Sequence, residues 1–167
     1  YVDALMLGYY PRKPRKKVMD LALDLKAKGV VKHLALSGHR RRLFPELLDS
    51  PIDIFQVRYN AANSGAEKDV FPHVGGERRP GIISFTATRW GQLLKESKMP
   101  PGEKALSAKD CYRFVLSNPA VDICMTGARN HEMMRENLET LDSGPLSEEE
   151  MARIRRIGDH VYGKPRS

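Results

Sequence analysis

The sequence has few cysteines and no long apolar run. Its 167 residues include only Cys111 and Cys124, which form no CxxC pair and no spacing typical of metal ligands. Two such isolated cysteines argue against a disulfide scaffold and indicate reduced, buried thiols. No apolar run approaches the roughly 18 residues that a membrane-spanning helix needs. We therefore expect a cytoplasmic protein with no metal ion and no membrane partner.

The common nucleotide-binding motifs are also missing. No GxGxxG follows the first predicted strand, and no GxxxxGK[ST] occurs anywhere in the chain. A Rossmann dinucleotide site and a P-loop therefore both lack their usual signature. Four of the histidines, at unrelated positions, show no metal-ligand spacing: they are His33, His73, His131 and His160.

The net charge of +7 belongs almost entirely to the first part of the chain. Residues 1–60 hold 12 Lys and Arg against 6 Asp and Glu, whereas residues 61–167 hold 16 against 15. Two basic runs, at 12–17 and 40–42, contribute most of this charge. Such a field attracts phosphates, acidic substrates or nucleic acid, although a solvated loop has the same composition. Because no aromatic residues interleave and no known module is present, we expect no nucleic-acid partner.

Short apolar runs alternate with amphipathic stretches along the whole chain. The apolar runs predict five buried strands, at residues 2–7, 30–37, 54–59, 81–86 and 121–125. Between and after these strands, apolar residues at helical spacing and capping residues predict helices. The predicted helices are at residues 17–28, 43–48, 66–74, 107–116, 130–141 and 147–160. Gly29, Ser107 and Ser147 fit helix ends, and residues 87–105 form a long loop. This order predicts a parallel sheet covered by helices.

Several of these segments, taken in order, resemble the aldo-keto reductase family. The matching stretches are YVDALML at 1–7, KAKGVVKHLALS at 26–37, FQVRYN at 55–60, GIISFT at 81–86, LSNP at 116–119, GAR at 127–129 and RENL at 135–138. The resemblance implies an α/β fold, a (β/α)8 TIM barrel present here as about five β/α units. It matches the chain to strands four to eight, the C-terminal part of the barrel, and makes residues 1–167 one domain.

The resemblance implies NADP(H) as the cofactor. Ser37 and Gln56, at the ends of two strands, match the polar groups that bind the nicotinamide carboxamide. Phe85 matches the aromatic residue that stacks on the nicotinamide, and Thr86 follows it. The structural alternatives are strand ends that satisfy local backbone groups and a ring that packs in the barrel. Next to Ser37, the family has asparagine where this chain has Gly38.

A second group of matches lies near the C-terminal end. Gly127 and Arg129 precede a predicted helix, and Arg129 matches the contact to the 2′-phosphate of the cofactor. Glu136 and Asn137, within that helix, match the residues that bind the adenine edge. The alternative is a charged pair on a helix surface. The family has glutamine where this chain has Met133.

None of the family's four catalytic residues has a match in this chain. The family's aspartate, tyrosine and lysine belong to strands one to three. Its histidine follows the fourth strand, where this sequence has Gly8. Either Gly8 relieves crowding at a tight strand end, or it makes room that Tyr9 or His39 fills from a neighbouring position.

Two functions follow from the resemblance. The first is an NADP(H)-dependent oxidoreductase that transfers hydride to a small-molecule carbonyl substrate, with this chain inactive by itself. The alternative is a non-catalytic dinucleotide-binding or regulatory barrel protein, which Gly8 favours. A partial barrel also exposes an open edge, so we expect homo-oligomers or aggregation through that edge.

Overall fold

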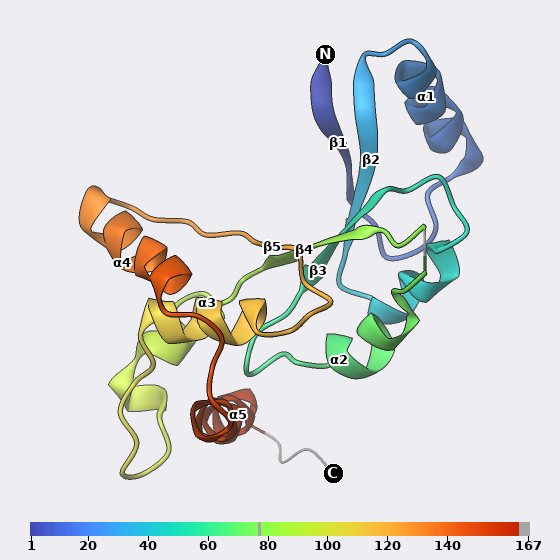
Figure 1. Cartoon of the computed structure of the whole chain (residues 1–167). Coiled ribbons are helices and arrows are strands. Elements are labelled where there is room, and N and C mark those ends of the chain that lie inside the picture. Colours follow the sequence, from blue (N-terminus) through green and yellow to red (C-terminus); the bar gives the residue numbers. More distant parts are fainter. Residues whose placement is uncertain (77, 164–167) are drawn as a thin grey trace. The chain divides into compact units, whose positions relative to one another are not determined.

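The computed structural model describes residues 1–76 and 78–163. Five strands form one sheet in the order β1-β2-β3-β4-β5 (Figure 1). β2 pairs in parallel with both β1 and β3. The strands are β1 (Val2–Tyr9), β2 (Val31–Gly38), β3 (Ile54–Arg58), β4 (Gly81–Phe85) and β5 (Ile123–Cys124). The alternating α/β order and the five strands predicted from the sequence are confirmed.

Five α-helices occur in the described residues: α1 (Lys16–Ala27), α2 (Ala66–Asp69), α3 (Ala108–Leu116), α4 (His131–Asp142) and α5 (Glu148–Tyr162). The helix predicted at 43–48 forms two 3₁₀ turns instead, Arg41–Leu43 and Pro45–Leu47. Pro45 has no N–H and cannot continue an α-helical ladder through this segment. Further 3₁₀ turns are Phe71–His73, Gln92–Leu94 and Glu96–Lys98.

The helix ends follow the capping residues of the sequence. Ser107 accepts from the backbone N–H of Asp110, whose side chain accepts from Ser107 in return. Ser147 and Glu150 form the same capping box at the start of α5. Gly29 directly follows the C-cap of α1 and has a φ of +71°. Glycine suits this left-handed position because it has no Cβ.

The chain forms two compact units. The first consists of Tyr1–Val57 and Gly65–Ile83, and the second of Arg58–Ser64 and Ser84–Ser167. The expectation that residues 1–167 make one domain stays a prediction. In the first unit, β2 and β3 supply the fully buried Leu34, Leu36 and Phe55. The ring of Phe55 packs at 5.1 Å, centroid to centroid, from that of Phe44.

β1 was predicted to be buried, and this prediction is wrong. Val2 and Tyr9 are about half exposed, and β1 stands at one end of the strand order. In the first unit α1 packs against β2 (Figure 1), so β1 gains little cover. Asp3 of this strand is mostly exposed and forms an ion pair with Lys32 at 2.8 Å.

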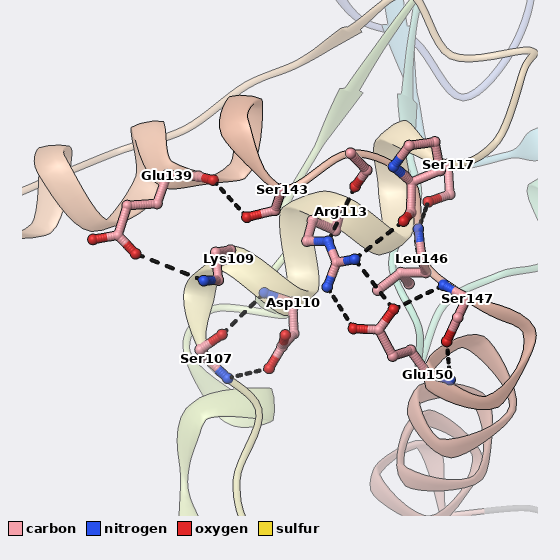
Figure 2. A network of polar contacts seen from close by, with 12 residues as sticks. Ser107, Lys109, Asp110, Arg113, Ser117, Glu139, Ser143, Leu146, Ser147 and Glu150 are labelled. Carbon is pink, nitrogen blue, oxygen red and sulfur yellow. Dashed lines mark hydrogen bonds and ion pairs between the residues drawn. The ribbon is translucent and has the colours of Figure 1, made fainter.

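The second unit has its core between α3, α5 and the segment after β3. Tyr59 and Phe114 pack ring against ring at 5.4 Å between centroids. Ile154 and Ile157 of α5 are almost completely buried. Polar contacts of Arg113 on α3 join this helix to α5 (Figure 2). Burial of these large side chains stabilises the unit mainly through the hydrophobic effect.

Candidate functional site

Ser37 and Gln56 lie side by side in the first unit, as the site prediction requires. They are register partners in the parallel pair of β2 and β3, and register partners share one face of a sheet. Ser37 is the second-last residue of β2, whereas Gln56 is the middle residue of β3 and not at its end as the sequence predicts. Ser37 is buried and Gln56 half-buried. In α/β sheets ligands bind at the carboxyl ends of the strands, so Ser37 occupies a suitable place and Gln56 lies beside it.

The loop after β1 approaches this place closely. The N–H of Tyr10 donates to the carbonyl of Ser37 at 2.9 Å. A Cβ built on Gly38 would lie 2.8 Å from the carbonyl oxygen of Tyr10, too close for any other residue without a shift. The family's asparagine therefore does not fit here while the loop keeps this position.

Gly8 adopts a φ of +82°, which disfavours any residue with a Cβ. The β1–β2 register is irregular between Met6 and Tyr9, on either side of it. A Cβ on Gly8 would meet no atom within 4 Å. Relief of crowding is therefore wrong as an explanation for this glycine, and backbone conformation replaces it.

Tyr9 and His39 contact each other at the ends of β1 and β2. Their rings pack edge to face, with centroids 4.5 Å apart. The two residues that were expected to compensate for Gly8 thus form one pair. A phenol and an imidazole are both capable of proton transfer at suitable pKa values.

In the second unit, Phe85 and Thr86 begin a backbone segment with unusual geometry. Phe85 is half-buried, and Thr86 has a φ of +59°. The carbonyl of Thr86 accepts from the side-chain amide of Asn60 at 2.9 Å. Asn60 is fully buried, and its amide oxygen also accepts from Asn63. Sequence reasoning assigned no role to Asn60, although it belongs to the matched FQVRYN segment.

The segment after Thr86 contains two further residues with positive φ, Arg89 at +51° and Trp90 at +53°. The guanidinium of Arg89 donates to the carbonyl of Val161, which fixes the segment to α5. Non-glycine residues in this region of φ cost free energy and cluster at ligand-binding sites. Trp90 is mostly exposed and is the only tryptophan of the chain.

Gly127 and Arg129 lie between β5 and α4, and both are exposed. The next residue, Asn130, caps α4 by accepting from the N–H of Met133 at 2.8 Å. Within the described residues, Arg129 forms no ion pair. Its guanidinium therefore stands beside a helix N-terminus with its donors available, an arrangement that favours phosphate.

Glu136 and Asn137, both on α4, have different environments. Glu136 is exposed, whereas Asn137 is buried. The amide nitrogen of Asn137 donates to the hydroxyl of Thr126 at 2.7 Å, and Thr126 donates to the Tyr112 oxygen at 2.8 Å. Burial raises the pKa of Tyr112 despite this hydrogen bond. Asn137 thus has a structural partner, and only its amide oxygen stays available for a ligand.

The cysteines show no sign of a reactive or metal-binding thiol. Burial raises the pKa of Cys124 to about 12, and the thiol of buried Cys111 is shifted in the same direction for the same reason. In residues 1–76 and 78–163 no group of His, Cys, Asp and Glu could hold a metal ion. None of the helices in the described part of the chain has the length and apolar character that a membrane crossing requires.

Comparison with known proteins supports the fold but gives no close relative. No family model matches the sequence, and none of the curated proteins does. Among solved structures, the holo form of aldo-keto reductase AKR11C1 from Bacillus halodurans superposes with a TM-score of 0.72 at 18% identity, over 93% of this chain. The thermostable aldo-keto reductase Tm1743, in complex with the inhibitor epalrestat, gives 0.70 at 22% identity, over 94% of this chain.

The chain spans about 60% of the length of each of these two solved structures. Five strands of an eight-stranded barrel account for a similar share. The chain has the parallel α/β fold of the aldo-keto reductases, over about three fifths of their length.

Proposed function

We propose that the chain is the cofactor-binding part of an NADP(H)-dependent oxidoreductase of the aldo-keto reductase type. The observation that carries the proposal is the pairing of Ser37, near the carboxyl end of β2, with Gln56 of the neighbouring strand β3. Two fixed polar side chains on one sheet face can hold a carboxamide in a single orientation. When bound, the nicotinamide would supply hydride to a carbonyl carbon.

In the second unit, other residues match the family's contacts to the remaining parts of the cofactor. Phe85 presents a half-buried ring for stacking. Arg129, exposed at the start of α4, presents a planar fork of donors suited to the 2′-phosphate. Glu136 and the amide oxygen of Asn137 would bind the polar edge of the adenine ring. Thr86 and Gly127 contribute backbone rather than side-chain chemistry at these two places.

The test is the affinity of the chain for NADPH and NADH, measured by calorimetry and by quenching of Trp90 fluorescence. One charge-assisted contact to the 2′-phosphate should make NADPH bind about tenfold more tightly than NADH. Arg129→Ala should abolish that preference. Arg135→Ala removes one positive charge from α4, the helix that follows Arg129, and should leave the preference intact. Equal affinities of the unmodified chain for both cofactors would overturn the proposal.

A non-catalytic dinucleotide-binding protein is the second candidate, and Gly8 is the observation that favours it. A histidine at position 8 would have to adopt the left-handed backbone seen there. NADPH oxidation with a panel of aldehydes, quinones and ketones distinguishes the two candidates. We expect no turnover from the chain by itself, because none of its residues matches the family's catalytic tetrad. Turnover that Tyr9→Phe or His39→Ala reduces would assign the acid–base role to that ring pair instead.

A further inference from the structure

We propose that the first unit carries a binding pocket for the anionic group of a small-molecule substrate, a carboxylate or a phosphate, lined by Arg12, Lys13 and Arg40. The inference rests on the proposed function and deepens it by naming the substrate class. The substrate would be a carbonyl compound with an anionic group at a distance from the reacting carbon.

The two basic runs of the sequence meet at one cavity of about 250 Å³. Arg12 and Lys13 come from the loop after β1, and Arg40 comes from the loop after β2. The remaining lining residues are Leu43, which is buried, and Glu46. The cavity thus has three cationic side chains, one carboxylate and an apolar contact, so its net charge is positive.

Three contacts fix these two loops to each other. The N–H of Tyr10 donates to Ser37, Gly38 packs directly against the Tyr10 carbonyl, and the ring of Tyr9 packs against that of His39. The backbones that carry the cations are therefore held together before any ligand arrives. A preorganised site binds with a smaller entropy loss than one that must assemble.

The three consecutive arginines at 40–42 have three different environments. Arg41 donates from Nε to Asp69 at 2.7 Å, and its guanidinium fills the space that a side chain at Gly65 would need. Arg42 lines a separate cavity together with Lys68 and Asp69. Arg40 lines the cavity that Arg12 and Lys13 of the first basic run also line. The three arginines therefore have different neighbours, and Arg40 is the one assigned to the proposed pocket.

The pocket cations outnumber Glu46, the acidic residue that also lines the cavity. Arg12, Lys13 and Arg40 are exposed, and none of them forms an ion pair within residues 1–76 and 78–163. Like charges that outnumber their counter-ions repel one another, and a bound anion reduces that cost. Arginine also presents parallel N–H donors that match the oxygens of a carboxylate or phosphate.

The pocket lies on the same edge of the sheet as the proposed nicotinamide-binding pair. Arg40 follows β2 by two residues, and Ser37 is near the end of that strand. Ligands of parallel α/β folds bind at this edge. An anionic group held by Arg12 and Arg40 would therefore place the rest of a small molecule toward Ser37 and Gln56.

The test is calorimetric titration at low salt with 4-carboxybenzaldehyde, neutral benzaldehyde and inorganic phosphate. We expect 4-carboxybenzaldehyde and phosphate to bind and benzaldehyde to bind at least tenfold more weakly. Arg40→Ala and Arg12→Ala should each weaken 4-carboxybenzaldehyde about tenfold. Arg42→Ala and Lys17→Ala are controls, because each removes one charge of the same basic runs from outside the pocket, and each should change affinity less than about twofold.

Two outcomes would overturn the proposal of an anion-binding pocket. The first is equal binding of benzaldehyde and 4-carboxybenzaldehyde. The second is an equal loss for Arg42→Ala and Arg40→Ala, which would indicate only a diffuse positive field. Titration of the same variants with NADPH separates the sources of anion: if Arg40→Ala weakens NADPH rather than the carboxylate, the pocket binds a cofactor phosphate and the substrate assignment is wrong. A chain that binds 4-carboxybenzaldehyde but not NADPH would refute the proposed function and leave the anion pocket standing.

Discussion

Arg113 holds Glu150 with two nitrogens of its guanidinium, at 2.7 Å from Nη1 to Oε1 and 3.1 Å from Nη2 to Oε2 (Figure 2). The same guanidinium donates to the carbonyls of Gly144 and Pro145, each at 3.1 Å. Glu150 also accepts from the backbone of Ser147 at the start of α5. The contacts of Arg113 therefore connect α3 both to the turn before α5 and to α5 itself.

This pair predicts a loss of stability in acid. The hydrogen bond from Arg113 is the main cause that lowers the pKa of Glu150 from 4.5 to about 2. A carboxyl whose pKa is lower in the folded state stabilises that state above its unfolded pKa. Its contribution is therefore complete above pH 4.5 and declines as the pH falls toward 2.

The measurement is the midpoint of thermal unfolding as a function of pH. Glu150→Gln should be less stable than the unmodified chain at pH 6, and the difference should shrink below pH 4.5. Glu149→Gln is the matched control, because Glu149 is an exposed acidic residue in the same helical turn. If the unfolding midpoint depends on pH in the same way with and without Glu150→Gln, the ion pair of Arg113 and Glu150 contributes nothing to folding stability.

Asp53 is a second carboxylate with structural partners, this time in the first unit. It accepts from Lys26 Nζ at 2.6 Å and from the N–H of Leu34 at 2.8 Å. Burial by itself would raise the pKa of Asp53, but these two hydrogen bonds outweigh it and hold the pKa below its usual value. Asp53→Ala should lower the free energy of unfolding by about 1–2 kcal/mol in denaturant titrations. Asp49 is an exposed residue that lines the same surface cavity as Asp53. Asp49→Ala should change the free energy of unfolding by no more than about 0.5 kcal/mol.

Gly158 brings α5 against the backbone of Ala61. A Cβ on Gly158 would overlap the Ala61 carbonyl group, which is backbone and cannot move cheaply. Alanine gains about 1 kcal/mol over glycine inside a helix, but overpacking costs roughly 1–3 kcal/mol. Gly158→Ala should therefore destabilise the second unit despite its better helix propensity. Gly127→Ala, where a Cβ meets nothing within 4 Å, serves as the control, and a more stable Gly158→Ala variant would contradict the close packing.

Thr126 holds the side chain of Asn137, a candidate adenine-binding residue. Thr126→Val would leave the buried amide nitrogen of Asn137 without its hydrogen-bond partner, so stability should fall by about 1–3 kcal/mol. NADPH should also bind more weakly, since Asn137 would lose its fixed orientation. Thr140→Val is the control, because the buried hydroxyl of Thr140 has no hydrogen-bond partner among the described residues and its removal should be neutral or stabilising. An NADPH affinity unchanged in Thr126→Val would remove Asn137 from the cofactor site.

The features that the sequence determined are those set by neighbours within a few residues. Apolar runs located the five strands, and Ser107 and Ser147 located two helix starts, because a cap needs only the next three residues. The motif around Ser37 correctly placed this residue near the end of β2, whereas Gln56 lies in the middle of β3 and not at its end. Because β2 and β3 are adjacent parallel strands, the two residues still pair.

Partners distant in the sequence had to come from the tertiary structure. The same pattern of apolar residues predicts burial for a central and for an edge strand, so the exposure of β1 depended on its place in the sheet. The basic run at 40–42 is uniform in composition, yet Arg41 binds Asp69 and packs over Gly65. Arg40, in contrast, lines one cavity together with Arg12 from another loop. Likewise, the composition does not indicate that Gly8 adopts a positive φ. Neighbouring residues determine where helices and strands form, whereas long-range packing decides which side chains form contacts within the protein and which can bind a ligand.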